Sequence, residues 1–282
     1  MMPSHGVMVH GYLPETSNIE VVSPAGVCCA GMHALKYAFM SLKLGDKKKA
    51  VATGSERFAQ TMVADNFNEE VQKLIELEKN PYIAFEKDFL RWMLSDGAGA
   101  LMLETEKNPD GLSLRIDWME ACSFAHQYET CMYMGGDKLK NGELKSYKDY
   151  DVGELADKSL MSIKQDVRLL GKNIVALGNE LLISSLEKHN VNIEDIDYFL
   201  PHLSSYFFKK PIADTLEAGG LNIPEEKWFT NLSTKGNVGA GSIYLMIEEL
   251  FNSGKLKKGD QILLMVPESA RFSYVYTWLT VC

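Results

Sequence analysis

The chain has 282 residues, of which 46% are hydrophobic and 24% are charged, and its formal net charge is −9 at pH 7. That length is enough for one large domain or for two compact halves with buried cores. The negative charge disfavours nonspecific nucleic-acid binding, and the sequence has no apolar run of the roughly 18 residues that cross a membrane. The first residues lack the charged and apolar segments of a signal peptide. We therefore expect a globular protein with neither nucleic acid nor membrane as a partner.

The cysteines are odd in number, two of them are adjacent, and none has the spacing of a CxxC pair or a zinc site. This pattern argues against a disulfide framework and a bound metal, and it indicates reduced thiols in a cytoplasmic protein. One or two reactive cysteines remain possible. The positions are Cys28, Cys29, Cys122, Cys131 and Cys282.

Strands and helices are predicted to alternate in the first part of the chain. A short β-branched run is followed by a turn of small residues and then by a helix with regularly spaced apolar residues. A strand, helix, strand unit of this kind builds parallel sheets. The expected elements are a strand at 19–23, a helix up to residue 44, a strand at 50–56, an exposed helix at 66–80 and a strand at 95–104.

The second part begins with a strand near Leu112 and a polar, glycine-rich loop, and we place the boundary between two halves there, at 1–111 and 112–282. Each half contains a similar turn, at 44–46 and at 258–260, which suggests duplication of one α/β unit. The further elements expected are a long helix at 153–189, a strand at 197–202, a helix at 206–219, a strand entering the glycines before a helix at 242–252, and two final strands.

The segment VCCAGM places two cysteines where a strand is expected to turn into a helix. Unpaired backbone N–H groups and the positive end of the helix dipole favour the thiolate at such a position. Small neighbours leave room for a substrate carbonyl. A free cysteine is, however, more often a small core residue, so this segment alone leaves both interpretations equally open.

Two further polar residues lie at positions suited to a site. His202 ends a strand, where ligand sites of α/β sheets collect, and Asn237 lies between glycines before a helix. Taken singly, each is as well explained by a structural histidine or a turn asparagine. His33 lies one helical turn after Cys29 and could reach the same cavity. The glycines at 96–99 lack the spacing of a phosphate-binding loop.

Cys, His and Asn in this order resemble the condensing enzymes of the thiolase superfamily, and most closely β-ketoacyl-acyl-carrier-protein synthase III. The resemblance covers essentially the whole chain and places Cys29 at the nucleophile position. It implies an α/β, thiolase-like fold in which two duplicated βαβαβαββ halves form five layers, α-β-α-β-α, with the N-terminal half incomplete. The matching segments are GVCCAG, Gly54-Ser55-Glu56, the turn at 95–100, PHLSS at 201–205 and KGNVGAGS at 235–242.

The resemblance also implies a mechanism. Cys29 takes an acyl group from acyl-CoA or an acyl carrier protein, and His202 and Asn237 polarise the carbonyl of a malonyl-type thioester. Loss of CO₂ then gives an enolate that attacks the acyl-cysteine. Backbone N–H groups of Cys29 and Arg271 form the implied oxyanion hole. No metal or resident cofactor is implied, because coenzyme A and phosphopantetheine thioesters are the substrates.

The remaining implied features concern the pocket and the partners. A homodimer is expected, with an acyl carrier protein docking at Lys209 and Lys210. The implied substrate-pocket residues are His33, Phe85, Ser205 and Phe272.

Several departures point to a specialised relative rather than to the enzyme that initiates fatty-acid synthesis. Only 28 residues precede Cys29, so the family's first strand, first helix and second strand are expected to be absent. PHLSS lacks the Gln and Asn of the family's PHQAN, the family's glycine-rich loop is replaced at 267–272, and a longer segment at 57–95 suggests a helical cap. The alternatives are acyl transfer to an alcohol or amine, a truncated non-catalytic partner subunit, and a coincidence on an unrelated α/β fold.

Overall fold

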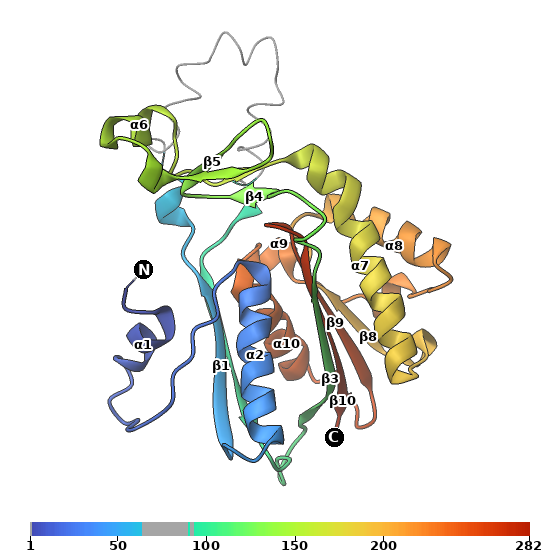
Figure 1. The fold of residues 1–282 in the computed structure, drawn as a ribbon. Coiled ribbons are helices and arrows are strands. Elements are labelled where there is room, and N and C mark those ends of the chain that lie inside the picture. Colours follow the sequence, from blue (N-terminus) through green and yellow to red (C-terminus); the bar gives the residue numbers. More distant parts are fainter. Residues whose placement is uncertain (1, 64–89, 91–92) are drawn as a thin grey trace.

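A computed structural model describes residues 2–63, 90 and 93–282 of the chain. Its larger sheet has four strands in the order β3-β10-β9-β8 (Figure 1). Strand β10 pairs antiparallel with both β3 and β9, and β8 runs parallel to β9. The bounds are Leu114–Ser123 for β3, Tyr198–Pro201 for β8, Gln261–Glu268 for β9 and Ser273–Val281 for β10.

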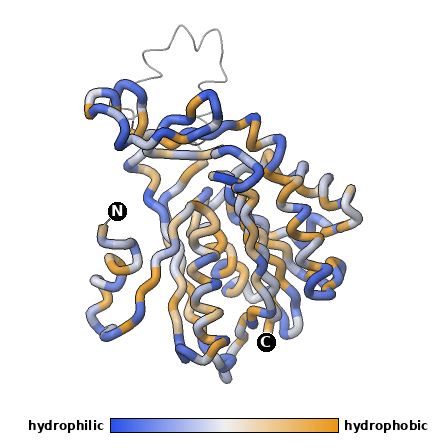
Figure 2. The backbone as a smooth tube through the Cα atoms, in the orientation of Figure 1, coloured by the Kyte–Doolittle hydropathy of each residue, from blue (hydrophilic) through white to orange (hydrophobic). Residues whose placement is uncertain are grey.

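A second sheet consists of β1 (Lys49–Glu56) and β2 (Gly97–Glu104), which pair antiparallel. Helices α2 (Cys28–Lys43) and α10 (Ser242–Asn252) pack between the two sheets. Apolar side chains of both helices and both sheets form one buried cluster there. Figure 2 shows hydrophobic residues along this central layer and hydrophilic segments around the periphery.

Helices α7 (Val167–His189) and α8 (Lys209–Ala218) cover the other face of the larger sheet. The Asp166 side chain accepts the Leu169 N–H at 2.9 Å and so caps the start of α7. Two buried tyrosines of β10 fix α7 against the sheet, because the hydroxyls of Tyr274 and Tyr276 donate to backbone carbonyls of that helix at 2.9 and 3.0 Å.

Short elements complete the described part of the chain. Within it, no helix is long and apolar enough to span a bilayer. The short helices and turns are α1 (His5–His10), η1 (Ala59–Thr61), η3 (Tyr147–Asp149), α6 (Val152–Asp157), η4 (Ile193–Asp195), η5 (Tyr206–Phe208), η6 (Glu225–Lys227), α9 (Leu232–Lys235) and η7 (Gly239–Gly241), and the short strands are β4 (Met132–Tyr133), β5 (Gly136–Lys138), β6 (Leu144–Ser146) and β7 (Lys164–Gln165).

Most expected elements are confirmed, but three are wrong. The strand expected to enter the glycines before α10 does not form, because only an isolated bridge between Trp228 and Phe199 precedes α9 there. Residues 19–23 form no strand, so the predicted parallel unit is absent and β1 pairs antiparallel with β2 instead. The long helix predicted at 153–189 is divided into α6, β7 and α7, with Ser159 at a φ of 45° between α6 and β7. The helix predicted at 66–80 lies outside the described residues.

One close backbone contact sets the position of the site. A Cβ atom added at Gly31 of α2 would lie 2.2 Å from the Ala240 carbonyl oxygen, and one added at Gly54 of β1 would lie 2.3 Å from the same atom. Only glycine allows this approach. It brings the loop before α10 directly against the start of α2 and the end of β1.

We expect Gly31→Ala to destabilise the fold by several kcal/mol, because the methyl group meets rigid backbone rather than a movable side chain. Urea unfolding of the purified chain measures the change. Gly171→Ala is the matched control, because Gly171 lies on helix α7 with no atom near its hypothetical Cβ, and alanine is the better helix former there. Equal stability of the two variants would contradict the close contact.

Candidate active site

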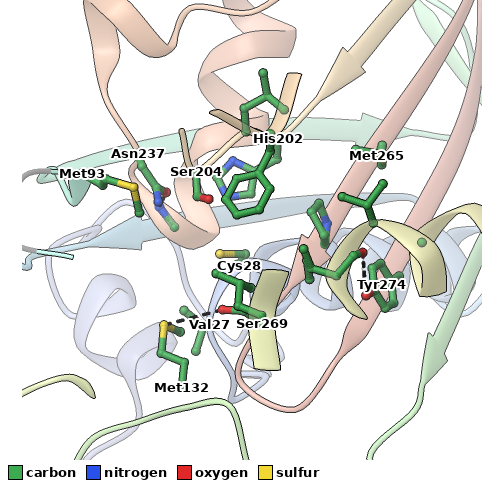
Figure 3. A pocket seen from close by; sticks show the side chains of 18 of the residues that line it. Val27, Cys28, Met93, Met132, His202, Ser204, Asn237, Met265, Ser269 and Tyr274 are labelled. Carbon is green, nitrogen blue, oxygen red and sulfur yellow. Dashed lines mark hydrogen bonds between the residues drawn. The ribbon is translucent and has the colours of Figure 1, made fainter. Parts of the chain in front are cut away.

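A pocket that is partly open to solvent lies where the larger sheet, the start of α2 and the loop before α10 meet. Cys28, His202, Ser204 and Asn237 line it (Figure 3). The lining is otherwise largely apolar and continues between α7 and α8.

The two adjacent cysteines have different surroundings. Cys28 lines the pocket, whereas Cys29 is 1% exposed and its thiol donates to the Val266 carbonyl at 3.3 Å. Burial, and then the nearby Glu268 carboxylate, raises the pKa of both thiols well above its ordinary value. The sequence-based expectation that this position lowers the thiol pKa is therefore wrong for the structure described, and attack by either sulfur requires a proton acceptor.

Glu268, at the end of β9, holds the start of α2. It is 8% exposed, and its Oε2 accepts the backbone N–H groups of Val27 and Cys29, each at 2.9 Å. A carboxylate is favourable at the positive end of a helix. The Cys29 N–H, expected in the oxyanion hole, is consequently occupied by a side chain of the protein itself.

A second carboxylate lies close by on strand β1. The pKa of Glu56 is raised, first by burial and then by the Glu268 charge. Its Oε1 accepts the Ala240 N–H at 3.4 Å, which links the end of β1 to the loop before α10. The charges of Glu56 and Glu268 both raise the pKa of the Cys28 thiol.

His202 follows β8 and is 3% exposed. Its backbone N–H donates to the Met265 carbonyl at 2.8 Å, which fixes the residue beside β9. Burial lowers the pKa of the imidazole to about 4, so His202 is neutral at pH 7. Its Nε2 has no hydrogen-bond partner among the described residues and is available to a ligand in the pocket.

Asn237 is also 3% exposed, and its orientation is fixed locally. The side-chain Oδ1 accepts the Gly239 N–H at 3.0 Å, and the backbone carbonyl accepts the Ser95 N–H at 2.8 Å. With Oδ1 engaged, the Nδ2 group is the end of the amide that can donate to a ligand. Figure 3 shows the Asn237 and His202 side chains on the same side of Cys28.

Three of the four implied pocket residues lie in the described structure, and none of the three lines the pocket. His33 is half-buried on α2 and does not line the pocket. Ser205 caps η5, where its Oγ accepts the Phe207 N–H at 3.2 Å. Phe272 has a φ of 57° and packs edge-on against Tyr128 in the core, with ring centroids 5.3 Å apart. Phe85 lies outside the described residues.

The other implied residues are at the surface. The exposed Arg271 donates through Nε to the Tyr128 carbonyl at 2.8 Å, so its side chain is held away from the pocket. Lys209 pairs with Glu225 at 2.8 Å, and Lys210 pairs with Asp214 at 2.7 Å. Exposed pairs of this kind are weak, so both lysines can exchange these partners for others.

Sequence reasoning missed several residues of the pocket and its border. Cys28 was available as the other half of the cysteine pair, and Glu268 stands out as a charge at the end of the apolar run QILLMVP. Ser204 lies beside the predicted His202. Gln165 and Ser269 carry no local signal, because only the tertiary structure brings them to the pocket. Among the described residues, no cluster of side chains suits a metal ion.

Comparison with known proteins supports the sequence resemblance. The family model "3-Oxoacyl-[acyl-carrier-protein (ACP)] synthase III C terminal" matches residues 186–267. The β-ketoacyl-[acyl-carrier-protein] synthase III of Aliarcobacter butzleri is 24% identical over 262 residues, which are 93% of this chain and 67% of that protein. The chain spans 61% to 67% of the length of the first curated relatives that it matches.

Solved structures agree on the fold. Synthase III from Aquifex aeolicus is 22% identical with a TM-score of 0.70, and the match covers 99% of this chain and 72% of that one. A variant of OleA from Xanthomonas campestris, with bound lauric acid and lauroyl-CoA, is 20% identical with a TM-score of 0.72. That match also covers 99% of this chain and 72% of the OleA chain. The predicted thiolase-like α/β fold and the resemblance to synthase III-type condensing enzymes are confirmed.

We expect Glu268→Gln to accelerate alkylation of Cys28. The neighbouring negative charge raises the pKa of this thiol, so its removal increases the thiolate fraction at a given pH, by about tenfold for each unit by which the pKa falls. Peptide mass spectrometry after timed iodoacetamide treatment at pH 8 measures the rate. Glu226→Gln, an exposed change on η6, should leave it unaltered. A rate that does not rise in Glu268→Gln would contradict the electrostatic role.

The buried, neutral His202 should make the fold sensitive to acid. The folded pKa of about 4 lies below the ordinary 6.5, so the unfolded chain takes up this proton first as the pH falls. The stability contribution is therefore present above pH 6.5 and is lost between 6.5 and 4. Relative to His202→Gln, the wild type should lose about 2–3 kcal/mol of unfolding free energy between pH 7 and pH 4.5. The same comparison with His126→Gln, at an exposed histidine, should show no such difference.

Proposed function

We propose that the chain holds an acyl group on the cysteine pair at the start of α2 and joins it to a malonyl-type thioester with loss of CO₂. One observation carries the proposal: a thiol, a neutral imidazole with an unpartnered Nε2 and an oriented amide line a single pocket, at Cys28, His202 and Asn237. The curated relatives bear the name of an enzyme of this class. Activity, substrates and partners are proposed here on that basis.

In the first step the thiol sulfur attacks the acyl thioester carbonyl. A carbon–sulfur bond forms, the carbonyl becomes an oxyanion, and the carrier thiol then departs. Because burial keeps the cysteine protonated, its proton leaves as the carbon–sulfur bond forms and is taken up by the departing carrier thiolate, and the His202 imidazole keeps its own proton for the second step.

In the second step the malonyl carbon–carbon bond breaks and CO₂ departs. The electron pair forms an enolate, whose oxygen is stabilised by N–H donors from His202 and Asn237. The enolate carbon attacks the acyl-cysteine carbonyl, a carbon–carbon bond forms, and the cysteine sulfur is released. The buried position of both donors strengthens these hydrogen bonds, because little solvent competes for them.

The motif and the geometry favour different members of the pair. The resemblance assigns the nucleophile to Cys29, which remains a prediction. In the structure, Cys28 lines the pocket, and Cys29 can reach a substrate only if its sulfur leaves the Val266 carbonyl. The geometry therefore adds Cys28 as the thiol that needs no rearrangement.

The apolar lining supports a medium or long acyl group as substrate. OleA, with the same fold, has lauric acid and lauroyl-CoA bound. The basic side chains of Lys209 and Lys210 follow the His202 segment on the surface and would receive an acidic carrier protein, as proposed from the sequence. A homodimer is part of the same proposal.

Acyl transfer is tested by incubating the chain with a panel of acyl-CoAs and locating the mass increase by peptide mass spectrometry. We expect the increase on the peptide that contains Cys28 and Cys29. Cys29→Ser abolishes it if the motif assignment holds, and Cys28→Ser abolishes it if the pocket-facing thiol attacks. Transfer that persists in the double variant would refute the proposal.

Release of CO₂ from malonyl-CoA distinguishes condensation from transfer to an alcohol or amine. We expect release from the wild type and a loss of about a hundredfold in Asn237→Ala, because one enolate donor is removed. Acylation without any CO₂ release would instead support the non-decarboxylating alternative.

Cys131→Ser is the matched control for the Cys28 and Cys29 variants of the acyl-transfer test, because Cys131 is a buried cysteine outside the pocket lining.

A further inference from the structure

Gln165 is the most conspicuous polar group in the pocket that the proposed mechanism does not use. It lies on β7, is 5% exposed and lines the pocket. Its Nε2 donates to the Ser269 hydroxyl at 2.9 Å, whereas its Oε1 has no hydrogen-bond partner among the described residues. One end of the amide is therefore held in place, while the other is buried without a hydrogen-bond partner among the described residues.

The surroundings of Gln165 offer little that could satisfy this oxygen. Met132, Ile163 and Val27 line the same pocket with apolar side chains. The Ser269 hydroxyl, which accepts from Gln165, itself lies 3.7 Å from the Met132 sulfur, a weak acceptor. An amide oxygen left unpaired in such surroundings destabilises the folded state, and a hydrogen-bond donor on a ligand would remove that cost.

The position of this amide indicates which part of a substrate reaches it. Figure 3 shows Ser269, Met132 and Val27 on the opposite side of Cys28 from His202. The malonyl thioester must approach His202 and Asn237, so the acyl chain on the cysteine has to extend away from them. That direction leads to Ser269 and to the amide that is bonded to it.

We propose that Gln165 selects an acyl substrate that carries a hydroxyl group, which donates a hydrogen bond to Oε1 inside the apolar part of the pocket. This inference rests on the proposed acyl transfer and specifies its substrate class. A site built to bind a hydroxyl rejects the analogue without one, because the protein's own polar atom is then buried unpaired. A plain acyl chain would leave Oε1 in that state.

The test uses pairs of medium-chain acyl-CoAs that are identical except for a hydroxyl at successive carbons of the chain. Acylation rates of the intact chain are measured by mass spectrometry for the wild type and for Gln165→Leu. We expect the wild type to prefer one hydroxyacyl-CoA over its plain partner by at least about tenfold. Gln165→Leu should abolish or reverse that preference while still being acylated by the plain substrate.

Asn179→Leu is the matched control, because Asn179 also lines the pocket and its Oδ1 is likewise unpartnered within the described part of the chain. It lies on α7, in the part of the lining that continues between α7 and α8 rather than beside Ser269. We expect the hydroxyl preference to survive this change. Thermal unfolding of both variants identifies any loss of the fold.

Each outcome has one meaning. Equal rates for every pair in the wild type overturn the inference and leave the proposed function intact. A preference for a carbonyl-bearing chain over the hydroxyl also overturns it, since the amide would then present Nε2. If Gln165→Leu lowers the acylation rate equally for all thioesters, the inference is overturned as well. Gln165 would then contact the coenzyme A or phosphopantetheine part that all these substrates share. Absence of acylation by every substrate, with Cys28 and Cys29 alkylated normally, refutes the proposed function itself.

Discussion

The arrangement of the site depends on the Ala240 carbonyl, against which Gly31 and Gly54 pack without side chains. This contact joins helix α2 and strand β1 to the loop that begins α10, although more than 180 residues of sequence separate Gly54 from Ala240. A side chain at either glycine would push the loop away and carry Asn237 with it. The Tyr244 hydroxyl donates to the Gly31 carbonyl at 2.7 Å and reinforces the same junction. The cysteines at the start of α2 and the Asn237 amide therefore line one pocket because Gly31 and Gly54 allow the Ala240 backbone to approach closely.

Local pattern was sufficient to predict most elements, and it marked His202 and Asn237 as polar residues at element boundaries, but only the family resemblance combined them with Cys29 into a site. Periodicity could not show where the long helix would be interrupted, because the spacing of apolar residues carries no signal for the left-handed φ of Ser159. Nor could it show that residues 19–23 would lack a strand partner. The family resemblance supplied the order of Cys, His and Asn along the chain, and the similarity to solved structures confirmed the fold.

The site was harder to predict than the fold, because its chemistry depends on burial. The same helix start that favours a thiolate in isolation carries thiols of raised pKa here, first because they are buried and then because Glu268 supplies a negative charge. Burial also keeps His202 neutral. The family pattern includes no carboxylate at this position, so motif matching alone attributes to Cys29 a free N–H that the structure shows engaged.

The hydrogen bonds between the Glu268 carboxylate and the start of α2 also affect how the protein would respond to inhibitors. Compounds that mimic a tetrahedral oxyanion depend on empty N–H groups at a helix start, but here they would have to displace a tethered carboxylate. A tethered group competes at a high effective concentration, whatever the free inhibitor concentration is. Neutral compounds that extend along the apolar lining avoid this competition. Selectivity between this protein and relatives without such a carboxylate could thus be obtained from charge alone.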